Sequence, residues 1–242
     1  MPKPNITMFF PAYNEEDNIP KVLDSAVNLL EQVANDYEIL VVVYEGSTDK
    51  TKEIVRKFAD KNKKIKLLLQ PKDKKGVGYA KRIGFKNAKY PYIFYADSDN
   101  QFDLNDFKKF LPYIGKFDVI AGYRIKRSDP KARIAVSRIY NAMMRLLFGA
   151  KERDLDCAFR LVNKRVIENI SLMCSTGAAT TELLAKARKK GFQIKEIGVT
   201  HLPRTSGQSA FETGLSLPKS REVYKILKEI AKLWVDMHIK GN

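Results

Sequence analysis

The chain has 242 residues and a formal net charge of +16, from 44 Lys or Arg against 28 Asp or Glu. This length is sufficient for one domain with a well-buried core. No apolar stretch is long enough to span a bilayer and the N-terminus lacks a signal-peptide core, which argues against an integral membrane or secreted protein. Cys157 and Cys174 lack metal-site spacing, and we expect reduced thiols in a cytosolic protein.

Strand and helix patterns alternate through the first 125 residues. Short apolar runs predict strands, and apolar residues three or four positions apart predict helices between them. Such alternation is typical of βαβ units with right-handed crossovers, so we expect an α/β fold with a mainly parallel sheet and flanking helices. The predicted strands are 6–12, 39–43, 65–69, 92–96 and 119–121, and the predicted helices are 16–33, a segment around 54–58, 77–88 and one around 107–111.

From Pro130 onward the pattern changes. Helices are predicted over 134–148, ended by Gly149, and over 182–190, ended by Gly191. Strands are predicted at 158–162 and 194–200. Because there is no repeat or convincing linker, we expect this half to elaborate the same domain.

The last segment, residues 218–239, is amphipathic, and Pro218 suits its first helical turn. Two interpretations remain open. The apolar stripe packs on the domain, or the helix lies in a membrane interface, because basic residues flank an apolar face that carries Trp234. The stripe contains Val223, Ile226, Leu227, Ile230, Leu233, Trp234 and Met237, and the basic residues are Lys219, Arg221, Lys225, Lys228 and Lys232.

The positive charge is unevenly distributed. Residues 50–89 hold fifteen Lys or Arg against three acids, and so supply +12 of the net charge. This bias indicates an anionic partner, such as a nucleic acid, a phosphorylated substrate or an acidic lipid surface. A solvated, Lys-rich surface explains it equally well.

The predicted strand at 92–96 ends in Asp97-Ser98-Asp99. Its residues are apolar on both faces, as in a buried parallel strand, and open α/β sheets bind ligands at the carboxyl ends of their strands. Mg²⁺ takes carboxylate oxygens and usually keeps phosphate oxygens as further ligands. The strand end therefore predicts a metal–diphosphate site.

Polar loops follow other predicted strands too. Residues 11–16 (Pro-Ala-Tyr-Asn-Glu-Glu) follow the first strand, residues 45–49 (Glu-Gly-Ser-Thr-Asp) follow the second, and the Gly-rich residues 76–82 begin the third helix. Each loop fits a ligand site. Each also fits an ordinary connection, in which Ser47 or Thr48 caps the next helix.

Together, the segments at 11–16, 46–49 and 97–101 resemble, in order and spacing, the family-two glycosyltransferases of GT-A fold. They resemble most closely the dolichyl-phosphate mannosyltransferase group and its polyprenyl-phosphate relatives, from about Asn5 to Ser209. The resemblance implies a GT-A, Rossmann-like domain over 1–213, with a nucleotide-sugar half (1–125) and an acceptor half (126–213). The C-terminal amphipathic helix, 214–242, would follow it.

The resemblance also implies roles in donor binding. Pro11, Tyr13, Glu15, Glu45, Asp97 and Ser98 would hold the nucleotide-sugar, and Arg204, in a loop at 201–209, would close on the diphosphate. Asp99 and Gln101, supported by Asp97, would bind Mg²⁺ or Mn²⁺. Tyr44 replaces an acid of the family pattern, which leaves guanine and uracil both open. We expect Asp103 and Asp106 to cap a helix.

Arg133 and Ser137 are four residues apart and would project from one helix face, where a guanidinium beside a hydroxyl fits a phosphate. A solvated basic helix explains the same spacing. The stretch resembles the lipid-phosphate-binding segment of the mannosyltransferase group, which implies that Arg124, Arg133 and Ser137 hold the acceptor phosphate. Asp154 would lie near the donor sugar or in a structural loop.

The sequence thus predicts a metal-dependent, inverting glycosyltransferase that moves a sugar, with mannose favoured, from GDP-mannose or a UDP-hexose to a polyprenyl or dolichyl monophosphate. Such an acceptor needs no strong general base, because the second pKa of a monophosphate is near 6. The residues expected to carry catalysis are Asp99, Arg124, Arg133, Ser137 and Arg204.

Two alternatives remain: transfer to a sugar hydroxyl, and a non-catalytic basic module that binds nucleic acid or anionic membrane. The favoured interpretation predicts no nucleic-acid partner. It places the protein peripherally on the cytoplasmic face of a membrane, either directly or through a membrane partner protein.

Overall fold

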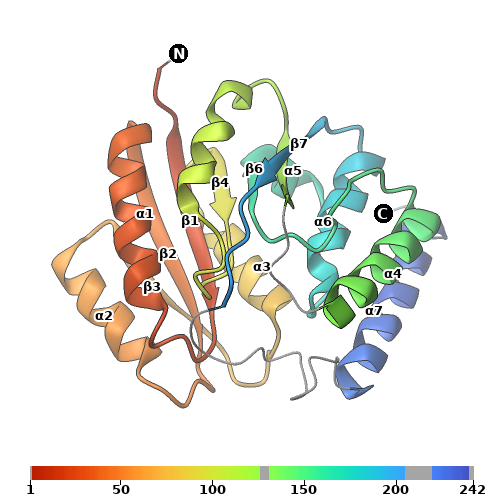
Figure 1. Ribbon diagram of the computed structural model, residues 1–242, viewed down its shortest axis with the longest axis horizontal. Helices are drawn as coiled ribbons and strands as arrows, with labels where there is room; N and C mark the ends of the chain where they lie inside the picture. The colour runs from red at the N-terminus through yellow and green to blue at the C-terminus, as the bar shows by residue number, and fades with distance from the viewer. Residues whose placement is uncertain (1, 126–130, 205–219, 240–242) are drawn as a thin grey trace.

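In the computed structural model, which describes residues 2–125, 131–204 and 220–239, seven strands form one sheet in the order β3-β2-β1-β4-β6-β5-β7 (Figure 1). β1 pairs in parallel with β2 and β4, β2 with β3, and β5 with β7, whereas β6 is antiparallel to β4 and β5. The predicted α/β fold with a mainly parallel sheet is therefore confirmed. The strands are β1 (Asn5–Ala12), β2 (Asp36–Tyr44), β3 (Ile65–Gln70), β4 (Tyr92–Tyr95), β5 (Val119–Arg124), β6 (Arg160–Asn163) and β7 (Ile194–Val199).

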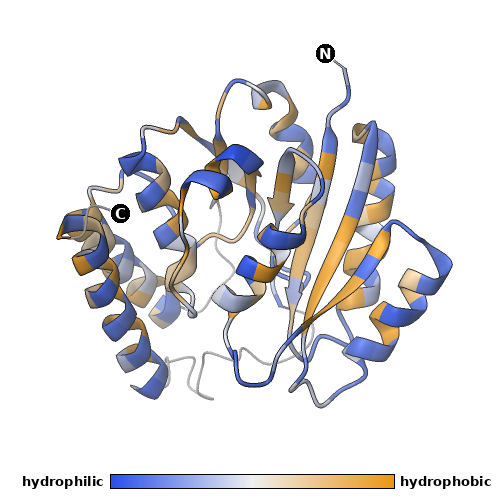
Figure 2. Ribbon diagram, turned by 180° about the vertical axis from the view of Figure 1, so that it is seen from behind, coloured by the Kyte–Doolittle hydropathy of each residue, from blue (hydrophilic) through white to orange (hydrophobic). Residues whose placement is uncertain are grey.

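Helices cover both faces of the sheet, because successive residues of a buried strand point to opposite sides. Met8 and Phe10 of β1 pack in one core with α1, α2 and the short helices η1 and η2, while Phe9 packs in a second core with α3, α4, α6 and α7. Figure 2 shows hydrophobic residues concentrated in the strands and hydrophilic residues on the outer sides of the helices. The helices are α1 (Ile19–Val33), α2 (Thr51–Lys61), α3 (Val77–Asn87), η1 (Leu104–Lys109), η2 (Leu111–Tyr113), α4 (Lys131–Phe148), α5 (Lys164–Asn169), α6 (Ala178–Lys189) and α7 (Ser220–His238).

Several predicted boundaries differ from the structure. The helix expected around 107–111 is the pair of 3₁₀ helices η1 and η2, and α6 begins four residues earlier than predicted. Gly149 and Gly191 follow α4 and α6 with positive φ of 61° and 80°, as expected of helix ends. The proposed boundaries at residues 126 and 214, and Pro218, lie outside the described residues.

α7 packs on the domain through Ile230, Leu233 and Met237, which are buried. Its Glu229 carboxylate accepts hydrogen bonds from the backbone and hydroxyl groups of both Ser175 and Thr176. The carbonyl of Ser175 in turn accepts the Gly78 N–H at 2.9 Å, at the start of α3. The C-terminal helix is therefore connected to the Gly-rich loop through one short segment.

Candidate active site

The first two loops at the carboxyl end of the sheet are bonded to each other. Asn14, with φ of 55°, accepts the Thr48 N–H at 2.9 Å, and the Glu15 N–H donates to the Thr51 hydroxyl at 2.8 Å. Asp49 binds the N–H and the hydroxyl of Thr51 at the start of α2. The idea that Ser47 or Thr48 caps this helix is wrong, because Lys50 occupies the N-cap position of α2 and the side chain that binds Thr51 comes from Asp49. These bonds fix the loop at 11–16 over the end of β1.

Two tyrosines form an aromatic wall beside this loop. The rings of Tyr13 and Tyr44 meet edge to face with centroids 5.7 Å apart, and the Lys75 ammonium lies 5.3 Å from the Tyr13 centroid. Tyr13 remains 36% exposed, so its ring is accessible to a ligand. Glu45 is exposed next to this wall, with its N–H bonded to the Gln70 carbonyl.

The acidic end of β4 is tied to the loop after β1 and to the segment before residue 204. The Ser98 hydroxyl donates to the Pro11 carbonyl at 2.7 Å. The Leu202 N–H donates to the Gln101 carbonyl at 2.7 Å, next to a β-bridge between Phe102 and His201. This antiparallel contact brings residues about a hundred positions apart in the chain to one edge of the sheet.

Arg204 reaches the predicted metal ligands from this segment. Its Nη2 lies 2.6 Å from Asp99 Oδ2 and 3.1 Å from Gln101 Oε1. Two ligand oxygens therefore converge on one cationic nitrogen. Arg204 therefore lies beside two of the predicted metal ligands, and its predicted contact with a diphosphate stays a prediction.

Carboxylates crowd this edge. Burial, and then the charge of Asp97, raise the pKa of Asp99 to about 6, while Arg204 and Arg133 act in the opposite direction. Burial also raises the pKa of Glu15 to about 7, with further contributions from Asp99 and Asp97. Because the charge of Asp97 raises the pKa of both Asp99 and Glu15, this edge favours a bound cation.

The donor set fits a divalent cation that shares its coordination with a diphosphate. Asp99 and Gln101 already direct oxygens to one positively charged atom, and Asp97 adds charge beside them. Among the described residues, no three His, Cys, Asp or Glu side chains are grouped to hold a metal by themselves. Oxygens from a phosphorylated ligand would complete the shell, as is usual for Mg²⁺.

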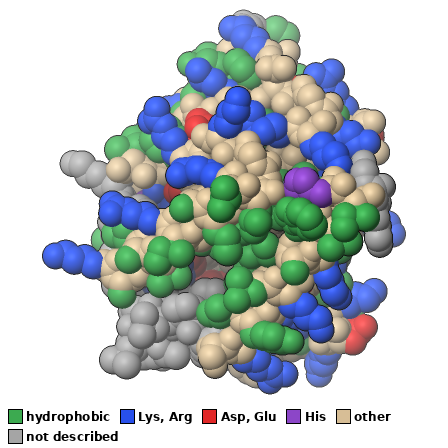
Figure 3. All heavy atoms as spheres, turned by 90° about the vertical axis from the view of Figure 1, so that its right-hand side faces the viewer, with side chains coloured by type: hydrophobic (Ala, Val, Ile, Leu, Met, Phe, Trp, Pro, Cys, Tyr) green, Lys and Arg blue, Asp and Glu red, His purple; other side chains and the backbone are tan. Residues whose placement is uncertain are grey.

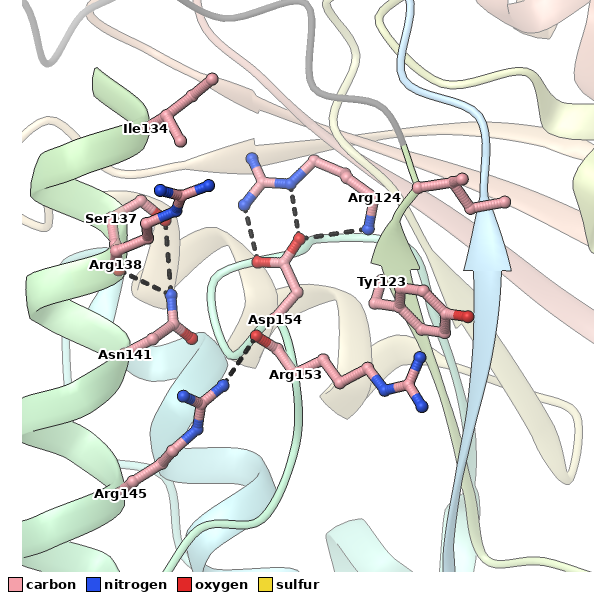
Figure 4. A pocket seen from close by; sticks show the side chains of 10 residues that line it. Tyr123, Arg124, Ile134, Ser137, Arg138, Asn141, Arg145, Arg153 and Asp154 are labelled. Carbon is pink, nitrogen blue, oxygen red and sulfur yellow. Dashed lines mark hydrogen bonds and ion pairs between the residues drawn. The ribbon is translucent and has the colours of Figure 1, made fainter. Parts of the chain in front are cut away.

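A second cluster lies where β5 ends against α4. Arg124 makes two parallel bonds of 2.7 Å to Asp154 (Figure 4). A third bond, of 2.8 Å, joins Arg124 to Asp156. The Ser137 hydroxyl donates to Asp156 at 3.0 Å, and Asn141 bonds the Ser137 carbonyl at 2.7 Å. Arg124 and Ser137, both predicted to bind a phosphate, are therefore brought together through Asp156. Of the two roles considered for Asp154, these contacts favour the structural one.

This cluster borders a cavity of about 360 Å³ (Figure 4). The Arg153 guanidinium lies 4.9 Å from the Tyr123 ring centroid, and Arg145 donates to the carbonyls of Glu152 and Arg153. Four arginines against one carboxylate give the cavity a positive lining that suits an anion. The lining residues are Tyr123, Arg124, Ile125, Ile134, Ser137, Arg138, Asn141, Arg145, Arg153 and Asp154.

Three other acidic residues, Asp103, Asp106 and Glu182, have structural contacts. Asp103 caps η1, as expected, but Asp106 does not cap it, because its carboxylate accepts the Thr200 N–H and pairs with Lys109. Glu182 is fully buried and accepts the N–H groups of Met173 and Cys174.

Sequence reasoning assigned no role to Lys81 or Asp156. Lys81 is buried, donates to the Thr180 hydroxyl and lies 5.0 Å from the Tyr95 ring centroid. Burial lowers its pKa to about 8, and the charge of Asp97 opposes this shift. Two sequence features could have indicated these residues. Lys81 lies in the Gly-rich segment at 76–82, and Asp156 belongs to the Asp-Leu-Asp pattern at 154–156.

An open α/β sheet with an acidic carboxyl edge, an aromatic wall and a basic cavity has features that suit phosphorylated ligands. The family model for glycosyl transferase family 2 matches residues 7–171. The chain therefore belongs to that family.

Curated relatives are similar over most of the chain. It is 27% identical over 209 residues to the undecaprenyl-phosphate 4-deoxy-4-formamido-L-arabinose transferase of Photorhabdus laumondii, covering 85% of this chain and 62% of the relative. It is 26% identical to glycosyltransferase AglD of Haloferax volcanii, covering 82% of this chain and 33% of that protein. The chain thus spans less than two thirds of the length of these relatives.

Solved structures confirm the fold. The glucosyl-3-phosphoglycerate synthase of Mycobacterium tuberculosis, in complex with Mn²⁺, UDP and phosphoglyceric acid, superposes with a TM-score of 0.65 at 16% identity. The match covers 96% of this chain and 78% of that one. A complex of the same synthase with Mg²⁺ and UDP gives a TM-score of 0.64, also at 16% identity. The GT-A fold expected from the motifs is therefore confirmed.

Proposed function

We propose that this protein transfers a sugar from a nucleotide diphosphate-sugar to a polyprenyl or dolichyl monophosphate, with inversion at the anomeric carbon. One observation carries the proposal. Helix α4 serves two sites: its Arg133 acts electrostatically on Asp99, and Ser137, one turn further along, lines the basic cavity. A single helix thus connects a cation-binding edge with a pocket suited to a phosphate.

The donor would bind at the first loop. The exposed ring of Tyr13 offers a stacking surface to a base, with Pro11, Glu15 and Glu45 around it. Guanine and uracil can both stack on such a ring. We expect mannose from GDP-mannose, because the motifs resemble the mannosyltransferase group most closely, and a UDP-hexose is the alternative donor.

The diphosphate leaving group would lie against Asp97, Ser98, Asp99, Gln101 and Arg204. When bound, Mg²⁺ or Mn²⁺ would act there as a Lewis acid that neutralises the diphosphate charge. The guanidinium of Arg204, now on Asp99, would turn to the leaving group and stabilise its growing charge.

The acceptor phosphate would be positioned by Arg124, Arg133 and Ser137. One phosphate oxygen attacks the anomeric carbon, a new carbon–oxygen bond forms, and the bond to the diphosphate breaks. No proton has to be removed first, because the attacking oxygen is already anionic at neutral pH. The isoleucines of the cavity, Ile125 and Ile134, provide an apolar wall for the start of the prenyl chain.

This arrangement favours a phosphate over a sugar hydroxyl as acceptor. A hydroxyl needs a general base. The carboxylates beside the cavity, Asp154 and Asp156, are bonded to Arg124, and Asp156 also to Ser137, which leaves them poorly suited to take a proton. No described helix is long and apolar enough to cross a bilayer. Because the proposed acceptor is a membrane lipid, we propose peripheral contact with the cytoplasmic face, direct or through a partner protein.

The test is a donor panel of GDP-mannose, UDP-glucose and UDP-N-acetylglucosamine, each radiolabelled and incubated with dolichyl phosphate and Mn²⁺. We expect labelled product that partitions into organic solvent. Label found only in water-soluble product would overturn the acceptor assignment. An Arg133→Ala variant that turns over as fast as the wild type would contradict the proposed role of Arg133 in binding the acceptor phosphate.

A further inference from the structure

α7 carries more apolar side chains than its contact with the domain buries. Ile230, Leu233 and Met237 are buried against the domain. Leu227 and Trp234 lie along the edge of this buried stripe, at 46% and 39% exposure, and Tyr224, further around the helix, is 69% exposed. Burial against the domain therefore does not account for these exposed apolar side chains.

α4 has the same property. Leu146 is 86% exposed and Ile139 is 70% exposed, seven residues apart and therefore on one side of the helix. Arg138 and Arg145 are also seven residues apart, next to this stripe, and both line the cavity. α4 contains no Asp or Glu.

The two helices lie side by side. The rings of Phe148 in α4 and His238 in α7 are 6.2 Å apart, and His238 stacks on Trp234 at 4.9 Å. Figure 3 shows the side of the molecule that carries both helices, where hydrophobic side chains gather in a belt with Lys and Arg around it. Few Asp or Glu are visible on this side.

We propose that the exposed sides of α4 and α7 form a docking surface for an anionic lipid membrane. Isolated exposed apolar residues are common, but an apolar belt of two adjacent helices with a basic border is the pattern of an interfacial element. The belt would enter the boundary between headgroups and acyl chains, while Arg138, Lys228 and Lys232 contact acidic headgroups.

Charge complementarity favours a membrane over a second copy of this chain. Two copies of one basic surface would face each other with like charges, which opposes association. The docking surface also borders the cavity, because Arg138 and Arg145 belong to both. The proposal therefore deepens the proposed function and rests on it for the acceptor, which would enter the cavity from the bilayer without leaving it entirely.

Trp234 is the single tryptophan of the chain, is 39% exposed and lies on the proposed surface, so its fluorescence reports docking directly. The complete chain is mixed with vesicles of phosphatidylcholine, with or without phosphatidylglycerol and with brominated acyl chains. We expect a blue shift and quenching by the brominated chains, stronger with phosphatidylglycerol and weakened by salt. An unquenched Trp234 that also keeps its emission wavelength would overturn the proposal.

Variants give the matched comparison. The pair Ile139→Glu and Leu146→Glu changes only exposed side chains, and we expect it to lower vesicle partitioning by roughly tenfold or more. Leu69→Glu is the control, because Leu69 is 42% exposed but belongs to β3, at the far edge of the sheet from α4. If the Ile139→Glu, Leu146→Glu variant bound vesicles as well as Leu69→Glu does, the proposal that α4 and α7 form the docking surface would be refuted. A dimer in light scattering that the pair dissociates, without any change in vesicle binding, would assign the surface to a second copy instead.

Activity separates this proposal from the proposed function. With a short, water-soluble prenyl phosphate the Ile139→Glu, Leu146→Glu pair should turn over like the wild type, and with a long-chain acceptor in vesicles it should be slower. If this variant lost turnover equally with the short and the long-chain acceptor, the result would contradict a role of these residues in membrane docking. If the wild type docks but transfers sugar to no prenyl phosphate, the proposed function fails and the membrane surface stands.

Discussion

The ion pair between Arg124 and Asp154 provides the sharpest test of the candidate site. Both side chains are nearly buried, at 6% and 10% exposure, and two bonds of 2.7 Å join them. Burial alone would lower the pKa of the Arg124 guanidinium, but its bond to Asp154 and the charge of Asp156 raise it instead. Asp154→Ala removes the two-bond partner and leaves the guanidinium to Asp156 alone.

We expect Asp154→Ala to lower the free energy of unfolding by about 3 kcal/mol. Loss of one partner of a buried pair usually costs roughly 3–5 kcal/mol, and the remaining Asp156 places this site at the lower end. Replacing both members, as in Arg124→Met with Asp154→Leu, should recover most of the loss, since neither buried charge remains and Asp156, which is 33% exposed, keeps its bond to Ser137. Urea unfolding of the wild type, Arg124→Met, Asp154→Leu and the double variant gives the coupling energy.

Lys64→Ala is the control for this cycle. Lys64 pairs with Asp36 at 2.9 Å, but both side chains are about half exposed, at 45% and 44%. Such a surface pair contributes at most about 1 kcal/mol. If Asp154→Ala cost no more than Lys64→Ala, Arg124 would not depend on Asp154, and its position at the cavity would need another explanation.

Three further predictions concern the donor side. Asp99→Asn should lower turnover by about a hundredfold or more and weaken Mn²⁺ binding measured by calorimetry, whereas Asp103→Asn, at the cap of η1, should do neither. Because the pKa of Glu15 rises from 4.5 to about 7, its contribution to stability is full below pH 4.5 and is lost as pH rises to 7. Urea titrations below and above this window should show a loss of roughly 2 kcal/mol, after allowance for partial exposure, that is absent in Glu15→Gln. Gly78→Ala should destabilise the fold by about 1–3 kcal/mol, because a Cβ there would lie 2.2 Å from the Cys174 carbonyl oxygen, while Gly177→Ala, with open space around it, should be near neutral in thermal melts.

The sheet could be predicted because parallel strands buried on both faces leave continuous apolar runs, as in 39–43 and 92–96. The antiparallel direction of β6 leaves no such trace, since strand direction is set by the connections and not by the side chains. The helix predicted around 107–111 became two 3₁₀ turns, where Pro112 lacks a backbone N–H and Asp106 binds the distant Thr200.

The candidate site was predictable where its residues follow directly on a strand. Asp97, Asp99 and Gln101 belong to one strand end, so their proximity follows from local chain direction. The contacts of Arg204 with Asp99 and of Arg124 with Asp154 depend on folding partners 105 and 30 residues away. Without the family resemblance, no spacing in the sequence indicates such pairs.

The carboxylate of Glu229 has a consequence for any shortened form of this chain. It holds Ser175 and Thr176 from one side, while Gly78 holds Ser175 from the other, just after Lys75 at the aromatic wall. The last helix therefore holds in place the segment that binds the start of α3, next to the loop that carries Lys75. We expect a truncation before residue 220 to remove these contacts and, if the proposed donor site is correct, to weaken nucleotide binding as well as stability.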